Sequence, residues 1–412
     1  MTAELISYPF LFAAIYFEVF LLLTFLSSPA RHSRTRSAST STPTVALIVP
    51  AWNEAKTIKG SILSLLALEY PSEKLSIVVV NDGSTDDTKE VLKEFENHPR
   101  VTVIHQENGG KHSALNTGIA AAKDAEIVGC MDADSFVDPG ALREIVGCFD
   151  NPKVGAATVA MSVHQPRNLV ETMQNVEYIL GIALRHILAS VNGLYVTPGP
   201  FSLYRRSIVE EVGGFRNGHN AEDMEMALRL QRHGYWIENA PKARVYAQSP
   251  KTVRSLVKQR VRWTSGFLRN VIYDYRDLIG NPKYGTLGLL VLPLGFFAIV
   301  GGVLLFFVVI FRLVADIVKT YLITNGLPLS YLLTPRISFD LFFFPITIFV
   351  TMAIVAALGS VMFILIGRHI SQTPAKLGMG LFGWLFLYGL IAPFWLVRAL
   401  ADVATGTRRP WR

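Results

Sequence analysis

Four long apolar runs dominate this sequence and limit what the chain can fold into. Three of them, 287–311, 341–367 and 377–397, contain no charged residue, and a fourth, 5–28, contains only Glu18. A helix needs about 20 apolar residues to cross the hydrocarbon core of a bilayer, and each run meets that length. We therefore expect one N-terminal and about three C-terminal transmembrane helices, with a globular domain between them.

The charges around the first apolar run predict the orientation of that domain. No basic residue precedes the run, whereas Arg31, Arg34 and Arg36 follow it. A secretory signal peptide has the opposite arrangement. Because basic flanks stay on the cytoplasmic side, we expect a multi-pass protein of the plasma or inner membrane with its globular domain in the cytoplasm. An intramembrane carboxylate such as Glu18 would by default mark a functional site.

The expected organisation has five segments. They are an N-terminal transmembrane helix (1–29), a basic linker (30–43), a globular domain (44–280), a transmembrane region of about three helices (285–402) and a basic tail (403–412). Three spans after the domain would place the basic tail outside the cell, against the positive-inside rule. Either one run is a re-entrant or interfacial piece, with Pro293 and Pro393 as candidate break points, or the tail is an exception.

The composition argues against nucleic-acid binding and against a cysteine-based metal site. The formal net charge is +7, but the basic residues form no run interleaved with aromatic residues, so we expect no nucleic-acid partner. Cys130 and Cys148 lack metal-ligand spacing and agree with a reducing compartment.

Hydrophobic runs rich in Val and Ile alternate with amphipathic stretches through the first half of the domain. The runs are TVALIVPAW, KLSIVVVNDG, VTVIHQ and AEIVGCMDAD. This alternation predicts an α/β fold with a parallel sheet covered by helices on both faces. Ligands bind outside the carboxyl ends of such strands, and the polar clusters of the sequence fall at that edge. The clusters are Trp52-Asn53-Glu54, Asn81-Asp82-Gly83, Asn108-Gly109-Gly110-Lys111 and Asp132-Ala133-Asp134.

The segment MDADS places Asp132 and Asp134 at the end of an apolar run. Two carboxylates this close repel one another, and their desolvation is costly unless a cation lies between them. Mg²⁺ or Mn²⁺ prefers oxygen ligands and would also bind a substrate diphosphate. Aspartate pairs that cap surface helices are common, but the position at the end of a buried strand favours the metal interpretation.

Two of the other clusters admit a structural and a functional interpretation. Asp82 either forms a turn or helix cap, which Ser84 and Asp86 could equally provide, or accepts a hydrogen bond from a nucleobase. Lys111 follows two glycines that allow close backbone approach, so it could contact a phosphate, although a solvated lysine is the default.

Helical motifs follow in the second half of the domain. Asp223 precedes an amphipathic stretch, where an acidic residue is favoured as a helix cap. Arg262 could pair with a diphosphate and Trp263 could stack on a sugar ring, unless their helix, at about 252–268, is simply a basic amphipathic helix on the membrane surface. The stretch of about 168–190 is a further amphipathic helix, compatible with core packing or with the membrane interface.

Taken together, the motifs VPAWNEA, VNDGSTDDT, GGKHSALNTG, MDADS and QRVRW resemble those of the membrane-embedded inverting glycosyltransferases of family 2. This family includes the synthases of poly-N-acetylglucosamine, hyaluronan, cellulose and chitin-type oligosaccharides. The resemblance runs from about Val45 to Phe267, and the order of the motifs makes it specific. It implies a GT-A-type, Rossmann-like domain with a mixed, mostly parallel sheet, and an inverting hexosyl transfer from a UDP-sugar with Mg²⁺ or Mn²⁺ as cofactor.

The resemblance also implies roles for individual residues. The implied donor-binding residues are Ala51, Glu54, Asp82, Lys111, Asp132 and Arg262. The implied acceptor-binding residues are Gln259, Trp263, Phe201 and Tyr204, the last two within 197–206. The implied metal ligands are Asp134 and Asp132, and the implied catalytic residues are Asp223, as the general base, and Glu222. The usual T-E-D motif of the family is A-E-D here, with Ala221 in place of the threonine, which leaves the base intact.

Three functions stay open on the sequence. The first is a processive synthase that polymerises a sugar, with UDP-N-acetylglucosamine as the expected donor, into an exported polysaccharide. The second is a non-processive transferase that acts on a membrane lipid, because ceramide-type glucosyltransferases carry a similar R-W motif. The third is a binding or scaffold protein with a decayed domain, although every catalytic position is intact. The expected partners are the UDP-sugar, a growing glycan or lipid acceptor, membrane lipids and an accessory or export subunit.

Overall fold

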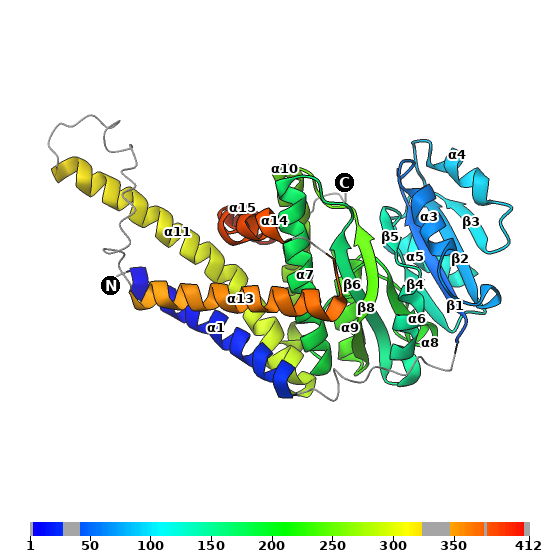
Figure 1. The fold of residues 1–412 in the computed structure, drawn as a ribbon, viewed down its shortest axis with the longest axis horizontal. Coiled ribbons are helices and arrows are strands. Elements are labelled where there is room, and N and C mark those ends of the chain that lie inside the picture. Colours follow the sequence, from blue (N-terminus) through cyan, green and yellow to red (C-terminus); the bar gives the residue numbers. More distant parts are fainter. Residues whose placement is uncertain (1–2, 28–41, 324–346, 375–376, 408–412) are drawn as a thin grey trace.

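An eight-stranded mixed sheet forms the centre of the globular domain in the computed structural model, which describes residues 3–27, 42–323, 347–374 and 377–407 (Figure 1). The strands are β1 (Val45–Ala51), β2 (Leu75–Asp82), β3 (Val101–Gln106), β4 (Ile127–Cys130), β5 (Ser135–Val137), β6 (Val154–Val163), β7 (Ser202–Arg205) and β8 (Trp236–Ala247). Their spatial order is β3-β2-β1-β4-β7-β6-β8-β5. The first four are parallel, β7 runs antiparallel between β4 and β6, β8 is parallel to β6, and β5 is antiparallel to β8.

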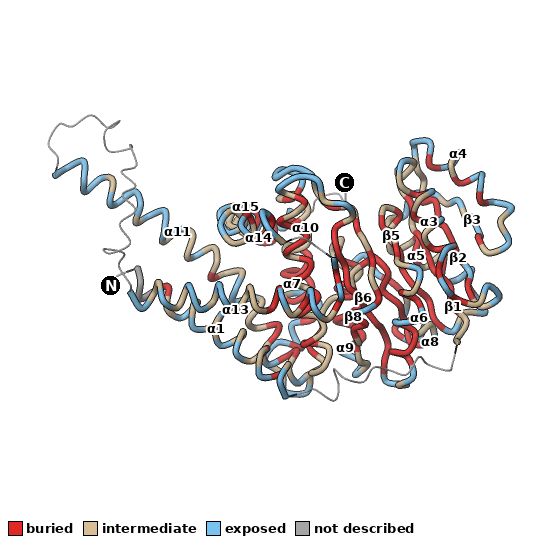
Figure 2. The backbone as a smooth tube through the Cα atoms, in the orientation of Figure 1, coloured by how far each residue is buried: buried red, intermediate tan, exposed pale blue. Residues whose placement is uncertain are grey.

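Helices cover both faces of this sheet, so its central strands are buried along their length (Figure 2). The helices are α3 (Ile58–Leu66), α4 (Thr88–Leu92), α5 (Lys111–Ala121), α6 (Ala141–Val146), α8 (Arg206–Glu211) and α9 (Glu222–Arg232). Apolar residues of α5, α8 and α9 form one hydrophobic core, and those of α3, α4 and α6 form the other. The α/β fold with a mixed, mostly parallel sheet is confirmed, and the covered faces explain why the strands are continuous apolar runs.

Two long helices lie where the sequence predicts amphipathic ones. The first, α7 (Leu169–Ser190), begins with a capping box between Asn168 and Glu171, and packs against β6 on one side and a membrane helix on the other. The second, α10 (Val253–Arg269), begins with a capping box between Thr252 and Ser255. Such reciprocal side-chain bonds satisfy the free backbone N–H groups of the first turn, so both helix starts are encoded locally.

Within the described part of the chain, four helical segments are long and apolar enough to cross a membrane. They are α1 (Ala3–Ser27), α11 (Leu292–Ile323) with the π-helical turn Leu287–Val291 before it, α13 (Ile348–Ser371), and α14 (Gly378–Gly383) joined to α15 (Gly389–Ala404) by the π-helical turn Trp384–Tyr388. The protein is therefore a membrane protein. Of the segments predicted above, most of the basic linker (30–41), parts of the C-terminal region (324–346 and 375–376) and the last residues of the tail (408–412) lie outside the described residues.

Polar and glycine contacts join the membrane helices to one another and to the domain. The Ser360 hydroxyl of α13 donates to Oε1 of Glu18 in α1 at 2.9 Å, so this intramembrane carboxylate pairs two helices. Towards the C-terminal end of α13, Gly367 lies directly against the backbone carbonyl of Ile179 in α7. A glycine there lets the two helix backbones approach closely.

We expect Gly367→Ala to destabilise the protein by about 1–3 kcal/mol, because the added Cβ would meet the Ile179 carbonyl and force α13 away from α7. Thermal unfolding of the detergent-purified chain measures this. The matched control is Gly389→Ala, where no described atom lies within 4 Å of the added Cβ. This second substitution should stabilise the helix by about 0.5–1 kcal/mol. Equal melting temperatures for the two variants would contradict the close packing of α13 on α7.

Candidate active site

A buried ion-pair network joins three segments that lie far apart in the sequence. The Lys111 ammonium lies 2.7 Å from Oδ1 of Asp132 and 3.0 Å from Oε1 of Glu222. Lys111 exposes 13% of its side chain and Glu222 only 7%, so little water screens their attraction. Burial alone would lower the pKa of Lys111, but the neighbouring carboxylates outweigh it and hold this pKa well above its usual value. Lys111 is therefore a permanent cation at the centre of the site.

Each partner stands at the end of a secondary-structure element, which fixes its position. Asp132 follows β4, while Lys111 and Glu222 are the first residues of α5 and α9. Gly110, just before Lys111, has a φ of 85°, a conformation that favours glycine. Gly199 passes so close that a Cβ there would lie 2.6 Å from Nζ of Lys111. The turn Thr197–Phe201 therefore needs a glycine at this point.

Asp82, at the end of β2, organises the loop that precedes Lys111. Its carboxylate accepts hydrogen bonds from Nε2 of Gln106 at 2.6 Å and from the backbone N–H groups of Gly109 and Gly110, both at 2.9 Å. A carboxylate has about four acceptor positions, so one remains for a further donor such as a base N–H. Asp82 thus has a structural role and keeps the capacity for the predicted uridine contact.

Ala51 and Glu54 lie at the end of the neighbouring strand, β1. Ala51 is 1% exposed, so it can offer a ligand little beyond its backbone. The Glu54 carboxylate accepts a hydrogen bond from the Thr57 hydroxyl at 2.8 Å. The capping role that the sequence left open falls to Asp86, whose Oδ1 accepts from the backbone N–H of Thr88 at 3.0 Å.

Asp132 and Asp134 are the residues that could hold a divalent cation. Asp132 is paired with Lys111, and Oδ1 of Asp134 accepts from the Ser135 hydroxyl at 3.3 Å. Within the described ranges, no group of three His, Cys, Asp or Glu side chains is placed to hold a metal ion. A cation would therefore take one or two carboxylates here and complete its shell with water and phosphate oxygens, as Mg²⁺ usually does. These donors fit an ion that is shared with a substrate diphosphate.

Asp223 follows Glu222 in the first turn of α9. Its Oδ1 accepts from the backbone N–H of Met224 at 2.8 Å. Burial and then the Glu222 carboxylate raise the pKa of Asp223 to about 6. Burial would also raise the pKa of Glu222, but the Lys111 ammonium overcomes this and lowers it. Asp223 is therefore the member of the pair that can exchange a proton near neutral pH.

Phe201 and Tyr204 do not line an acceptor surface. They are 0% and 1% exposed, so the prediction that their side chains contact an acceptor is corrected. The Tyr204 hydroxyl donates to Oγ1 of Thr197 at 2.9 Å, and the Thr197 hydroxyl donates to the backbone carbonyl of Asp223 at 2.8 Å. The physical reason is hydrophobic: both rings fill the core beneath the turn and thereby support the start of α9.

The start of α9 is also held by α10, the helix of the QRVRW motif. Arg262 donates through Nη1 to the backbone carbonyl of Asn220 at 3.1 Å. Gly266 packs against Ala221, where an added Cβ would lie 2.7 Å from the Ala221 Cβ. The small residue of the A-E-D motif, Ala221, thus packs against a glycine on the facing helix. Arg262 of the QRVRW motif lies beside the acidic pair.

Arg260, inside the QRVRW motif, connects Gln259 and Trp263 to the rest of the protein. Its guanidinium donates to Oε1 of Gln259 at 2.7 Å and to Oε2 of Glu177 at 2.5 Å, and lies 4.2 Å from the Trp263 ring centroid in a cation–π contact. The Tyr388 hydroxyl accepts from Nε of Arg260 at 3.2 Å and donates to the same Glu177 oxygen at 2.5 Å. Helix α7 and the last apolar segment therefore hold the arginine between two predicted acceptor residues.

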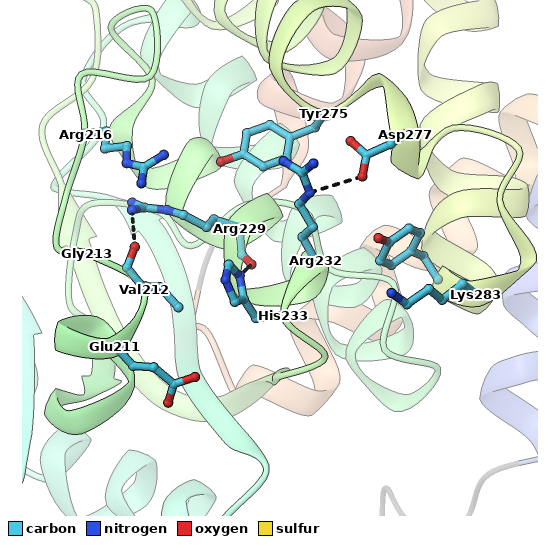
Figure 3. Close-up of a pocket in the computed structure, with 11 residues that line it drawn as sticks. Glu211, Val212, Gly213, Arg216, Arg229, Arg232, His233, Tyr275, Asp277 and Lys283 are labelled. Atoms are coloured by element: carbon cyan, nitrogen blue, oxygen red, sulfur yellow. Dashed lines mark hydrogen bonds and ion pairs between the residues drawn. The ribbon is translucent and has the colours of Figure 1, made fainter.

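A separate cavity of about 800 Å³ lies at the C-terminal end of α9 (Figure 3). Two of its arginines are neutralised within the fold, because Arg229 lies 2.8 Å from Glu225 and Arg232 lies 3.1 Å from Asp277. None of the predicted donor, acceptor or metal residues lines it. The cavity is therefore not part of the candidate active site.

Sequence reasoning missed several residues that build the site. The Pro-Gly-Pro sequence around Gly199 was a usable signal, since a glycine between two prolines indicates a turn with close backbone approach. Gln106 acts through a neighbour and carries no motif, whereas Thr197 lies in the segment 197–206 that the sequence had related to the acceptor and instead supports the start of α9. Glu177 and Tyr388 lie 83 and 128 positions from Arg260, so no local pattern could reveal them.

Tyr388→Phe should loosen α10, because it removes the hydroxyl that bonds both Arg260 and Glu177. We expect amide hydrogen exchange in 253–269 to rise about fivefold, the effect of losing one hydrogen bond, with no change in β1 and β2. The control is Tyr16→Phe, which alters an exposed ring on α1. The same exchange in both variants would show that the Tyr388 hydroxyl does not hold α10.

Comparison with known proteins agrees with this geometry. Residues 43–266 match the model of the glycosyltransferase-like family 2. A poly-β-1,6-N-acetyl-D-glucosamine synthase of Staphylococcus epidermidis is 30% identical over 286 residues, which cover 68% of each chain. The synthase of Staphylococcus aureus strain COL is 30% identical over 289 residues, with the same coverage.

A solved structure shows the same architecture. A mannosyltransferase from Pyrobaculum calidifontis, in complex with GDP-mannose and Mn²⁺, superposes with a TM-score of 0.61 at 20% identity and covers 97% of this chain and 99% of its own. At that identity the likeness shows the fold, which is that of the GT-A glycosyltransferases. With the family match over more than half of the chain and the motif residues gathered at the sheet edge, this chain belongs to glycosyltransferase family 2 and is a glycosyltransferase.

Proposed function

We propose that this glycosyltransferase polymerises N-acetylglucosamine from UDP-N-acetylglucosamine, with inversion at the anomeric carbon, and keeps hold of the growing chain between additions. The observation that carries the proposal is the meeting of Lys111, Asp132 and the Glu222–Asp223 pair at one point. This cluster would place a cation for the donor directly next to a base for the acceptor. The names of the staphylococcal relatives support the choice of sugar.

In the proposed reaction, Asp223 is the general base. Its carboxylate takes the proton of the acceptor hydroxyl while that oxygen attacks the anomeric carbon of the donor. The bond between this carbon and the diphosphate oxygen breaks, and UDP leaves with the electron pair. One displacement inverts the configuration and needs no covalent intermediate. A pKa of about 6 keeps Asp223 mostly ionised at neutral pH, and yet basic enough to accept a proton.

Charge on the departing diphosphate would be neutralised by cationic side chains that lie beside the acidic pair. Lys111 and Arg262 are the cationic side chains closest to the acidic pair in the network described above. Mg²⁺ or Mn²⁺, held by Asp134 and Asp132, would supply further charge neutralisation when bound. Asp82, with Ala51 and Glu54, would receive the uridine.

Acceptor binding is assigned to Trp263 and Gln259. An indole face is a suitable platform for a sugar ring, and Arg260 fixes both side chains in one place. The apolar segment that contacts Arg260 through Tyr388 brings the membrane next to this acceptor position. We propose that the domain faces the cytoplasm and that the product leaves through the membrane region beside α10.

Donor turnover by the detergent-purified full chain tests the proposal. UDP release and product size are measured with UDP-N-acetylglucosamine, UDP-glucose, UDP-glucuronate and UDP-galactose, each with Mg²⁺ or Mn²⁺ and with EDTA. We expect turnover of UDP-N-acetylglucosamine, a long product and loss of turnover in EDTA. A single sugar transferred only after lipid is added would establish the lipid transferase instead. The absence of turnover with every donor, despite UDP binding, would overturn the proposal.

Asp223→Asn should lower kcat by about 10²–10⁴-fold, because the acceptor hydroxyl loses its base, while UDP binding measured by calorimetry stays unchanged. Asp134→Asn should instead raise the concentration of the divalent ion that is needed for half-maximal turnover. The control for both is Asp87→Asn, an exposed aspartate at the start of α4. Native kcat in Asp223→Asn would remove this residue from the mechanism.

The pH dependence of kcat/KM should report the ionisation of Asp223 and its coupling to Glu222. Asp223 must be ionised to accept a proton, so kcat/KM should fall roughly tenfold per pH unit below about pH 6. Glu222→Gln removes the negative charge that helps to raise the pKa of Asp223, so the acidic limb should move to lower pH. Glu210→Gln, an exposed carboxylate on α8, should leave the limb in place. An unmoved limb in Glu222→Gln would refute this coupling.

A further inference from the structure

The cavity at the C-terminal end of α9 is lined mainly by basic side chains, and the proposed reaction does not use it (Figure 3). Its volume of about 800 Å³ is typical of pockets that hold a small molecule. A second cavity, of about 370 Å³, shares part of its lining. The shared residues are Arg232, His233, Lys283 and Tyr284. The larger cavity adds Arg216 and Arg229, together with the acidic residues Glu211 and Asp277.

The positive charge of the larger cavity is only partly balanced. Arg229 and Arg232 have acidic partners, as described above. Arg216 and Lys283 are both exposed, and neither forms an ion pair within the described part of the chain. Glu211 is the carboxylate among the described lining residues that is left to balance these two charges. The cavity therefore carries a net positive charge.

Two guanidinium groups meet at one wall of the cavity. Figure 3 shows Arg216 and Arg229 pointing toward one another, and a Cβ on Gly213 would lie 3.8 Å from Nη2 of Arg216 and 4.0 Å from Nη1 of Arg229. The Arg229 side chain is only 3% exposed, and its Nε has no hydrogen-bond partner among the described residues. Burial lowers the pKa of Arg229 and the charge of Arg216 adds to this, although the Glu225 carboxylate opposes both. A phosphate would relieve the repulsion between the two arginines, because its oxygens match guanidinium donors.

The cavity lies where the chain passes from the domain into the membrane region. Lys283 and Tyr284 line it and directly precede the candidate span Leu287–Ile323. On either side of them in the sequence, Tyr273 and Leu289 are large apolar side chains that are 57% and 53% exposed. Basic residues immediately beside a membrane helix are well placed to contact anionic headgroups. The cavity is thus at the level of the headgroups of one leaflet.

The segment that leads into the membrane, 270–286, also holds both ends of α9. Before the helix begins, Nδ2 of Asn270 donates to the backbone carbonyl of Gly218 at 2.9 Å. At the last residue of the helix, Arg232 pairs with Asp277 at 3.1 Å. A ligand that neutralises the cavity would bind residues of α9 and of this segment together, so it should stabilise the folded protein.

We propose that this cavity binds the phosphate group of an anionic membrane lipid from the leaflet next to the domain, with Arg216 and Lys283 as its principal contacts. A lipid headgroup fits better than a soluble phosphate, because the chain continues from the cavity into exposed apolar side chains against which acyl chains can pack. The site is separate from sugar transfer, since none of the proposed donor, acceptor or metal residues lines the cavity.

Lipid binding by the full chain, purified in detergent and stripped of lipid, tests the proposal without reference to the proposed function. Native mass spectrometry measures the affinity for phosphatidylglycerol, which is anionic, and for phosphatidylcholine, which has no net charge. Glycerol phosphate is added as a soluble competitor. The variant is the double substitution Arg216→Gln with Lys283→Gln. The matched control is Lys56→Gln with Lys89→Gln, which removes the same charge from exposed positions before α3 and in α4.

We expect the native chain to bind phosphatidylglycerol more tightly than phosphatidylcholine, and to melt at a higher temperature with the anionic lipid. The Arg216 and Lys283 double variant should bind phosphatidylglycerol about 30-fold more weakly, about fivefold for each charge removed, whereas the control should bind it as the native chain does. Equal weakening in the two double variants, or equal binding of the two lipids, would overturn the proposal. Displacement of phosphatidylglycerol by an equal concentration of glycerol phosphate would overturn the assignment to a lipid.

A second measurement needs no substitution. Phosphatidylglycerol with a photoreactive group on its headgroup is crosslinked to the native chain, and the labelled peptides are identified. Crosslinks within 211–216 or 275–286 would support the proposal. Crosslinks confined to other parts of the chain would contradict it.

Discussion

The ammonium group of Lys111 is the interaction on which the site depends. It brings Asp132, at the end of β4, and Glu222, at the start of α9, to within 3.0 Å of one cation although 90 residues separate them. Without it two carboxylates would face each other with little water, and breaking such a buried pair typically costs about 3–5 kcal/mol. The close passage of Gly199 and the positive φ of Gly110 both allow this ammonium to lie between the end of β4 and the start of α9.

The same cation also helps to separate the pKa values of the two adjacent acids. Glu222 and Asp223 are adjacent, so their charges disfavour double ionisation. Lys111 contacts Glu222 and lowers its pKa against the effect of burial, whereas burial and then the Glu222 carboxylate raise the pKa of Asp223. An A-E-D sequence alone does not indicate which of its two acids has the raised pKa. The difference arises because Glu222, the first residue of α9, contacts Lys111. The backbone of Asp223, the second residue, is hydrogen-bonded to Thr197, which in turn accepts a hydrogen bond from Tyr204.

The part of the fold that follows from local patterns could be predicted from the sequence. The sequence shows β1 to β4 as apolar runs that alternate with amphipathic stretches. Glycines and polar residues mark the helix start at Lys111 and the strand ends. The structure brings the polar clusters at these strand ends to one edge of the sheet. The antiparallel insertion of β7 between β4 and β6 could not be predicted, because strand order depends on packing between distant segments. Phe201 and Tyr204 were misassigned because an aromatic residue beside a site motif looks the same whether its ring fills the core or a ligand pocket.

Contacts from the membrane region concentrate on one side of the catalytic domain. Helix α13 meets α7 through Gly367, and the last apolar segment meets α10 through Tyr388 and Arg269. The glycine loop and the carboxylate of Asp82, on the donor side, are instead held by the sheet itself. The proposed donor residues are therefore held by hydrogen bonds within the domain, while Arg260, which packs on Trp263, is held by α7 and the last apolar segment. A change in the membrane should consequently act first on the proposed acceptor position, because α10 is hydrogen-bonded to the last apolar segment.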